Sequence, residues 1–180
     1  LMEQKEGQNA PKKFWHERNS LFFADFIETL PDPDGIEQPL DLTYAVRDGL
    51  ICHCGEIDQQ GIKPRNENID LYSIKRPGLI QPFTWEGCVV KVADKISYLG
   101  RDIEDAITLG VLDKKLEELY KILQSKEVIN NTVIIHHLIK DLCQNSSVKN
   151  GLCFSDETFN LIKEIKDFNY KHIYFCDKIK

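Results

Sequence analysis

The 180-residue sequence lacks the patterns of several common enzyme and membrane classes. It has no glycine-rich phosphate loop and no nucleophile-elbow motif, which argues against P-loop nucleotidases and α/β-hydrolases. No apolar run approaches the roughly 20 residues that cross a bilayer, and no signal peptide is found. Strand-like alternation and repeats of about 20–50 residues are also missing. We therefore expect a cytoplasmic, all-α protein that has no membrane partner.

The six cysteines are scattered, and no Cys-x-x-Cys pair occurs among them. A zinc site built from such pairs is therefore not expected, and we interpret the cysteines as reduced thiols. The run Cys52-His53-Cys54 invites a metal interpretation. Adjacent ligands at a helix end point in different directions, however, and no second cluster completes the set. The sequence thus favours a structural role for this run.

Composition sets limits on the fold and on the partners. A hydrophobic content of 42% is enough for one buried core, and the length suits one domain of ordinary size. The net charge of −6 gives no general attraction to nucleic acid or to acidic membranes. A polyphosphate substrate would therefore need local cations, because the overall field repels it.

Apolar residues at helical spacing predict about six helices in a bundle. The expected helices cover residues 12–30, 42–54, 85–109, 113–124, 127–143 and 156–178. Asp41, Thr84 and Ser155 are predicted N-caps, and Gly110 is expected to close the third helix. Residues 55–82 are polar and predict a long loop, a kind of segment that is often functional.

The third expected helix has two distinct faces on a helical wheel. The apolar face, which should be buried, consists of Val92, Ile96, Leu99, Ile103 and Ala106. The polar face consists of Asp94, Tyr98, Arg101, Asp102 and Asp105.

The polar face is compatible with two interpretations. An ordinary solvated helix surface is the simpler one. Three aspartates within three turns, however, repel one another unless cations or a metal compensate them. A carboxylate that holds a metal, an ammonium that offsets phosphate charge and a phenol that donates a hydrogen bond together suit a metal-bound polyphosphate.

The segment VVKVADKISYLGRDIEDA, residues 89–106, resembles a motif of the deoxynucleoside triphosphate triphosphohydrolases of the HD superfamily. Three further segments agree with that family in order along the chain. They are FWHERNS at residues 14–20, LDLTYAVRDGLICH at 40–53 and ETFNLIKEIKDFNYKHIY at 157–174. The resemblance implies an HD-type catalytic portion at residues 1–110 and the start of a helical phosphohydrolase-associated region at 111–180.

The resemblance also implies a role for individual residues. Asp94 matches the last aspartate of the family's metal set, so a divalent cation such as Mg²⁺ or Mn²⁺ is the implied cofactor. Lys95 and Tyr98 match residues that contact the phosphates, and Asp102 matches an aspartate near the 3′-hydroxyl of the sugar. His16 matches a histidine at the phosphate ester, where an imidazolium can donate a proton to the leaving oxygen.

The sequence departs from the family pattern in one respect. The family's first histidine and its His-Asp pair should precede His16, yet the chain contains no His-Asp dipeptide and no histidine before His16. The chain begins with Leu1 rather than Met, so we expect part of a longer enzyme that carries these ligands. A degenerate relative is the alternative. In either case the metal is incompletely liganded by this chain, which alone should be nearly inactive.

Three hypotheses about function follow. The first is a fragment of a metal-dependent enzyme that hydrolyses a dNTP, with dGTP as one candidate, to deoxynucleoside and triphosphate. The second is a non-catalytic helical module that binds a nucleotide or mediates oligomerisation. The third is an HD-type hydrolase of other phosphate esters, against which the combination of Lys95, Tyr98 and Asp102 argues. Family relatives are multimeric, so a homo-oligomer is expected.

Overall fold

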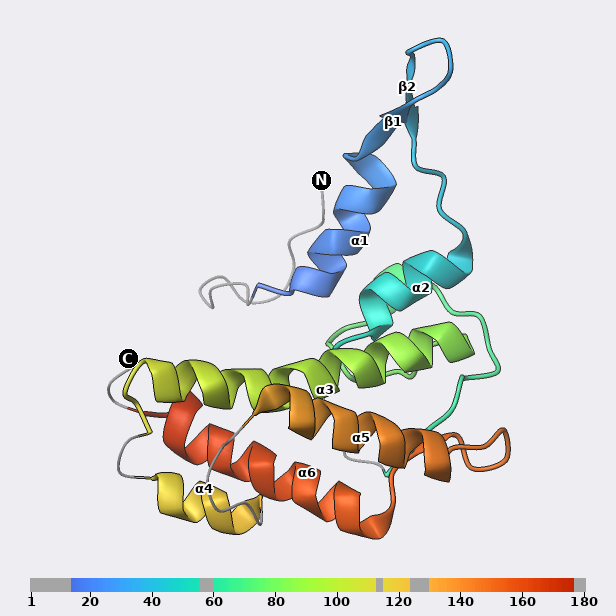
Figure 1. The fold of residues 1–180 in the computed structure, drawn as a ribbon. Helices are drawn as coiled ribbons and strands as arrows, with labels where there is room; N and C mark the ends of the chain where they lie inside the picture. The colour runs from blue at the N-terminus through green and yellow to red at the C-terminus, as the bar shows by residue number, and fades with distance from the viewer. Residues whose placement is uncertain (1–13, 56–59, 113–114, 124–129, 177–180) are drawn as a thin grey trace, which may run out of the picture.

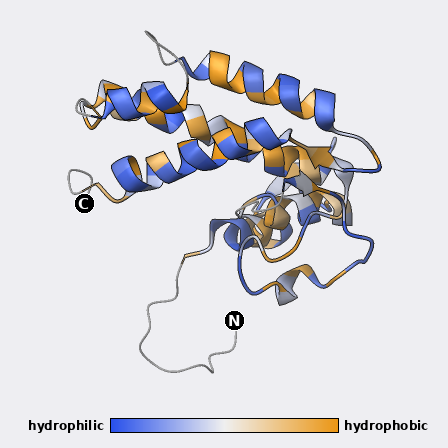
Figure 2. Ribbon diagram, turned by 90° about the horizontal axis from the view of Figure 1, so that it is seen from below, coloured by the Kyte–Doolittle hydropathy of each residue, from blue (hydrophilic) through white to orange (hydrophobic). Residues whose placement is uncertain are grey.

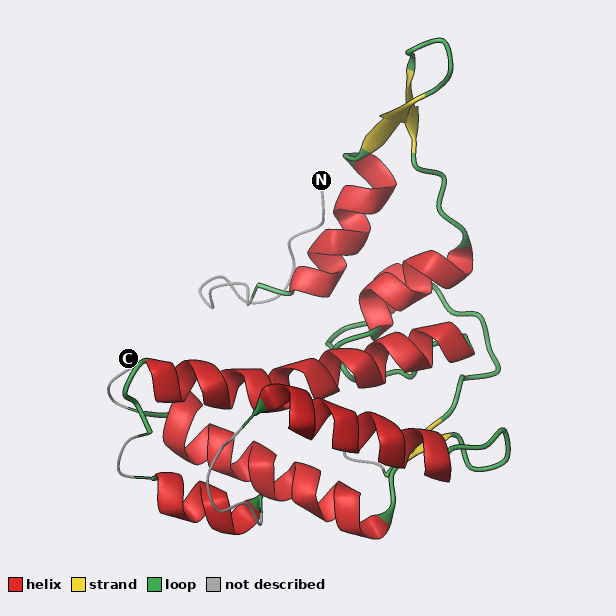
Figure 3. Ribbon diagram, in the orientation of Figure 1, coloured by secondary structure: helices red, strands yellow, loops and turns green. Residues whose placement is uncertain are grey.

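The computed structural model describes residues 14–55, 60–112, 115–123 and 130–176, and this part of the chain is mostly helical (Figure 3). Its α-helices are α1 (His16–Phe26), α2 (Tyr44–Cys52), α3 (Trp85–Thr108), α4 (Leu116–Ile122), α5 (Asn131–Asn145) and α6 (Asp156–Asn169). The expected class and the expected number of helices are confirmed. Within these residues no helix combines the length and the apolar character needed to cross a membrane.

Two small antiparallel sheets connect the helices. Strand β1 (Thr29–Pro31) pairs with β2 (Glu37–Pro39), and β3 (Gly61–Ile62) pairs with β4 (Leu152–Cys153). The segment between β3 and α3 contains the 3₁₀ turn η1 (Leu71–Ser73), and α6 continues into the π-helical turn η2 (Tyr170–Tyr174). Strands of two or three residues are too short to leave an alternating pattern, which is why the sequence did not indicate them.

Helix α1 is shorter than predicted because its C-terminal end gives way to the β1–β2 hairpin. The Oδ1 of Asp32 accepts hydrogen bonds from the backbone amides of Asp34 and Ile36, at 3.0 and 2.9 Å. Gly35 follows with φ at +80°, a conformation that glycine adopts without strain. The helix ends at Phe26, where the amides of Ile27 and Glu28 both donate to the Phe23 carbonyl oxygen, and the Asp32 contacts fix the hairpin turn that follows.

Three of the four predicted helix caps are confirmed. Thr84 Oγ1 accepts from the Gly87 amide at 3.0 Å, Ser155 Oγ accepts from the Thr158 amide at 3.2 Å, and Gly110 follows α3 with φ at +66°. The prediction that Asp41 caps α2 is wrong, because Thr43 occupies that position.

Helix α3 is the central element of the fold and packs against α2, α5 and α6 (Figure 1). All members of its predicted apolar face are buried in the main core, together with residues of α4, α5, α6 and η2. Blue and orange residues alternate along the helices in Figure 2, as expected for amphipathic helices.

A second, smaller core lies between α1, α2 and η1. Its buried members are Leu21, Ile51, Cys52, Leu71 and Ile74. Helix α1 packs on α2, and α2 in turn packs on α3, so the N-terminal elements lie over the first half of α3 (Figure 1). The proposed division of the chain at residue 110 stays a prediction.

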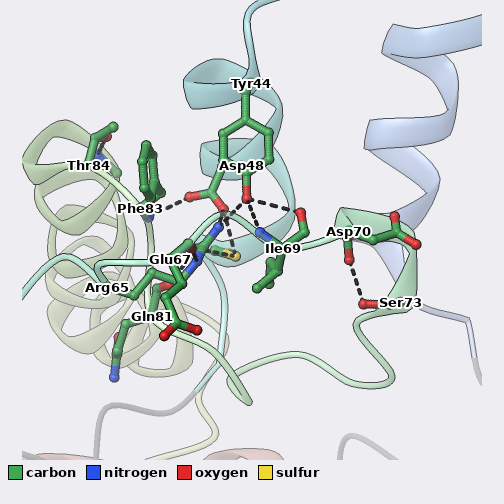
Figure 4. Close-up of polar contacts among 12 residues, drawn as sticks. Tyr44, Asp48, Arg65, Glu67, Ile69, Asp70, Ser73, Gln81, Phe83 and Thr84 are labelled. Atoms are coloured by element: carbon green, nitrogen blue, oxygen red, sulfur yellow. Dashed lines mark hydrogen bonds and ion pairs between the residues drawn. The ribbon is translucent and has the colours of Figure 1, made fainter.

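A buried polar network fixes the segment between β3 and α3 against α2 (Figure 4). Arg65 donates to the buried carboxylate of Asp48 and, at 2.6 Å, to the hydroxyl of Tyr44. The second oxygen of Asp48 accepts from the Phe83 amide at 2.6 Å, just before α3 begins. The guanidinium also donates to the Gln81 carbonyl at 2.7 Å. The network therefore sets the position of α2 relative to the start of α3.

Replacing Asp48 by alanine should destabilise the protein by about 3–5 kcal/mol, because the mostly buried Arg65 guanidinium would lose its only carboxylate partner among the described residues and the Phe83 amide would lose its acceptor. Urea unfolding followed by circular dichroism measures this change. Asp105→Ala is the matched control, since its ion pair with Arg101 is exposed, at 3.3 Å, and should contribute less than about 1 kcal/mol. Equal losses for the two variants would contradict the structural role assigned to the network.

Candidate functional site

Three elements meet at the thiol of Cys54, which lies two residues beyond the end of α2. The Sγ of Cys54 lies 3.3 Å from His16 Nε2, and His16 begins α1. The same sulfur lies 3.7 Å from Oδ2 of Asp94 on α3. His16, the predicted proton donor, and Asp94, the predicted metal ligand, therefore lie on either side of the Cys54 side chain. The sequence analysis had favoured a structural role for this cysteine.

The imidazole of His16 is held by the adjacent Glu17. Nδ1 of His16 lies 3.1 Å from Oε2 of Glu17, whose side chain is only 2% exposed, whereas the His16 side chain is 58% exposed. Because a carboxylate accepts hydrogen bonds, this contact places a proton on Nδ1 and directs Nε2 towards the thiol. The sequence analysis did not assign Glu17 a role, although its position after His16 is part of the resemblance.

His53 completes the group beside Cys54. Its ring meets the His16 ring edge-on with centroids 5.9 Å apart, and its Nδ1 lies 2.9 Å from the Leu50 carbonyl oxygen. One ring nitrogen of each histidine and the Cys54 sulfur all lie within 4.8 Å of one another. Cys52 points away from this group and is buried in the small core. For this residue the expectation that neighbouring ligands of the run point in different directions is met.

Lys91 of α3 binds the chain where it leaves α2. Its Nζ donates to the carbonyl oxygens of Cys52 and Cys54, at 3.1 and 2.7 Å, and the residue is 2% exposed. Burial lowers the pKa of this ammonium. The sequence analysis assigned Lys91 no role, and the packing of α2 on α3 buries it.

The carboxylates around Cys54 affect two titratable neighbours. Burial, followed by the charges of Glu17 and Asp94, raises the pKa of the Cys54 thiol to about 12. The Asp94 carboxylate is the main cause that raises the pKa of Tyr98. Both groups therefore keep their protons at neutral pH, so each remains a hydrogen-bond donor.

The other predicted substrate residues lie further along α3. Tyr98 is 56% exposed, and Asp102 accepts a hydrogen bond from the hydroxyl of Tyr174 in η2. Lys95 lines a narrow cavity bordered by Val92 and Phe159, at the start of α6. The structure thus brings His16, Asp94 and Tyr98 into one neighbourhood, links Asp102 to Tyr174, and places Lys95 at the border with the main core.

An apolar hollow of about 520 Å³ adjoins the cluster on one side. It lies between α2 and the first turns of α3, and His53 contributes to its wall. Its other lining residues are Ala45, Val46, Gly49, Leu50, Thr84, Glu86, Gly87 and Val90.

Comparison with known proteins shows one recurring similarity. The chain is 29% identical, over 167 residues, to a deoxyguanosinetriphosphate triphosphohydrolase-like protein of Caldanaerobacter subterraneus; the match covers 93% of this chain and 40% of the relative. Proteins of the same name from Desulfatibacillum aliphaticivorans and Clostridium tetani are also 29% identical, over 91% of this chain and 41% of each relative.

The chain resembles dGTP triphosphohydrolase-like proteins over most of its length. It spans about two fifths of the length of the curated relatives it matches. No family model matches it, and no solved structure gives a significant match.

The donor atoms at the site do not suit the divalent cation that the resemblance implies. Mg²⁺ requires near-octahedral oxygen coordination, and Mn²⁺ also favours oxygen ligands. Around Asp94 the described residues supply the Cys54 sulfur and, next to it, the His16 imidazole nitrogen, with the Glu17 carboxylate as the other nearby oxygen donor. Asp94 is the only member of the implied metal set that this sequence contains.

The protonated state of Cys54 predicts slow alkylation. A thiol with a pKa of about 12 is thiolate in roughly one molecule in 10,000 at pH 8, and the thiolate is the reactive form. Peptide-resolved mass spectrometry after iodoacetamide treatment should show Cys54 reacting at least about tenfold more slowly than Cys143, which is exposed. Equal rates for the two cysteines would contradict the environment described for Cys54.

Proposed function

We propose that this chain forms part of a dNTP triphosphohydrolase that releases deoxynucleoside and inorganic triphosphate, with dGTP as the candidate substrate. The observation that supports it is the meeting of His16 and Asp94 on either side of Cys54, because α1 and α3 are distant in sequence. The similarity to dGTP triphosphohydrolase-like proteins supports the same reaction class.

In this proposal His16 donates a proton to the sugar oxygen that leaves when water attacks the α-phosphorus. Three features suit it to the role: the exposed imidazole is open to a substrate, Nδ1 is held by Glu17, and Nε2 points into the site. The buried Glu17 carboxylate orients the imidazole through Nδ1, as the carboxylate of a catalytic triad does.

The remaining assignments concern substrate binding. Tyr98 is exposed and protonated, so its hydroxyl can donate to a phosphate oxygen. Lys95 would extend from its cavity beside α6 to offset phosphate charge, which a protein of net charge −6 must do locally. Asp102 accepts from the 3′-hydroxyl of the sugar, and Tyr174 fixes the orientation of that carboxylate.

The divalent cation belongs to the proposal for the longer protein. Asp94 would supply one oxygen ligand, and the other ligands would come from outside these 180 residues. A bound cation would neutralise phosphate charge and orient water.

A non-catalytic module remains the second candidate function. It is favoured by an apolar hollow of about 410 Å³ between α3 and α5, bordered by Val89, Ile135 and Ile139. Such a surface suits contact with a second copy of the chain, and the protein would then assemble as a homo-oligomer. Absence of hydrolysis by the protein encoded by the complete gene would favour this candidate.

The first test is an assay of the protein encoded by the complete gene with each dNTP and with Mg²⁺ or Mn²⁺. We expect release of inorganic triphosphate, and we expect Asp94→Ala to abolish it through loss of the metal. Asp105→Ala is the matched control on the same helix, since that carboxylate is exposed and pairs with Arg101. A wild-type protein that releases no triphosphate would overturn the proposal.

Asp102→Ala should have a different effect from Asp94→Ala. Losing a charged hydrogen-bond acceptor should lower kcat/KM for the dNTP by roughly 10- to 100-fold. The 2′,3′-dideoxy analogue, which lacks the 3′-hydroxyl, should be affected much less. Comparison of the two substrates by triphosphate release measures the difference. Equal, mild losses from the variants at 94 and 102 would refute the assigned roles.

A further inference from the structure

The donor cluster beside α2 has the composition of a zinc site. His16, His53 and Cys54 each place one donor atom within 4.8 Å of the others. A tetrahedral zinc ion with one sulfur and one nitrogen ligand holds those two atoms about 3.5 Å apart. The distance from Cys54 Sγ to His16 Nε2 is 3.3 Å, so this pair is already near the required separation.

Both histidines are oriented as zinc ligands usually are. A metal-bound imidazole typically donates its second N–H to a carboxylate or a backbone carbonyl, which fixes the ring and leaves the other nitrogen free. Glu17 takes this place for Nδ1 of His16, at 3.1 Å, and the Leu50 carbonyl takes it for Nδ1 of His53, at 2.9 Å. In each ring Nε2 is thereby left for a ligand.

The surroundings also suit a dication. The carboxylates of Glu17 and Asp94 both act on the Cys54 sulfur, and Lys91 is the cation that donates to the Cys54 carbonyl oxygen. Asp94 Oδ2, at 3.7 Å from Sγ, or a water can occupy the fourth position of a tetrahedron. Thiolate and imidazole select zinc over magnesium, which prefers oxygen ligands.

We propose that His16, His53 and Cys54 bind a zinc ion. On binding, the Cys54 thiol gives its proton to solvent and a zinc–sulfur bond forms, while Nε2 of each histidine donates a lone pair. The site differs from the metal set implied by the family resemblance, of which this chain has only Asp94. Its existence does not depend on the proposed function.

The site has one consequence that does rest on the proposed function. Zinc would occupy Nε2 of His16, the atom assigned to proton donation. Zinc binding and proton transfer by His16 therefore exclude each other, and the zinc-bound protein is inhibited.

The primary experiment measures zinc binding to the untagged 180-residue chain, without nucleotide, by competition with a chromogenic chelator. We expect one zinc per chain and no displacement by millimolar Mg²⁺. Cys54→Ser and His53→Gln should each weaken binding by more than the roughly 10- to 100-fold expected for removal of an outer partner such as Glu17, tested as Glu17→Gln. Circular dichroism confirms that each variant remains helical.

Two control variants test whether zinc binding depends on these particular side chains. Cys143→Ser removes an exposed thiol and His136→Gln an exposed imidazole, both on α5, and neither should change zinc affinity. With Co²⁺ as a probe, the wild-type chain should show a thiolate-to-cobalt charge-transfer band that Cys54→Ser lacks. Zinc binding that survives both site variants, or cobalt binding without the thiolate band, would overturn the proposal.

A second measurement concerns inhibition. Zinc at concentrations that fill the site should slow triphosphate release by the complete protein. The Cys54→Ser variant should be inhibited less by the same zinc concentration. Binding without inhibition would retain the zinc site and remove its regulatory consequence. A complete protein that is inactive under all conditions would refute the proposed function but leave the binding result intact.

Discussion

The arrangement of the candidate site depends on a single buried ammonium. Lys91 projects from α3 to the end of α2 and donates to the Cys52 and Cys54 carbonyl oxygens. Those carbonyls have no partner within their own helix, and an unpaired buried carbonyl costs about 1–3 kcal/mol. By satisfying both, Lys91 fixes where the chain leaves α2. His53 and Cys54 are consequently held between α1 and α3, where His16 and Asp94 reach them.

The helices and several of their caps could be predicted from the sequence, because they depend on residues close together in the chain. The apolar face of α3 has helical periodicity, and Thr84 and Ser155 cap helices through contacts only three residues long. The site was less accessible because its contacts join residues far apart in the chain. Nothing near Cys54 in the sequence shows that the chain turns after α2 and directs this thiol towards His16. The burial of Lys91 likewise depends on tertiary packing that covers an otherwise polar face.

The donor atoms around Cys54 bear on both metal ions proposed for this protein, the zinc ion and the divalent cation of the reaction. The proposed function calls for an oxygen-bound cation at Asp94, whereas the neighbouring Cys54 and His16 offer sulfur and nitrogen. The two kinds of ion would use adjoining donors, with Asp94 in reach of both. One short region therefore offers a hard and a soft set of ligands. If both proposals hold, the ion that occupies the region determines whether His16 Nε2 is free to transfer a proton.

The unequal size of the two apolar clusters has a consequence for how the site is maintained. The smaller one, between α1, α2 and η1, contains five fully buried hydrophobic residues, whereas the main core draws on α3 to α6. Regions with few buried apolar contacts open at lower free energy than the molecule as a whole. Local opening of α1 would separate His16 from Asp94 while the rest of the bundle stays folded. The contact between His16 and Asp94 at the candidate site thus depends on the smaller core, and heating would separate these residues before the whole bundle melts.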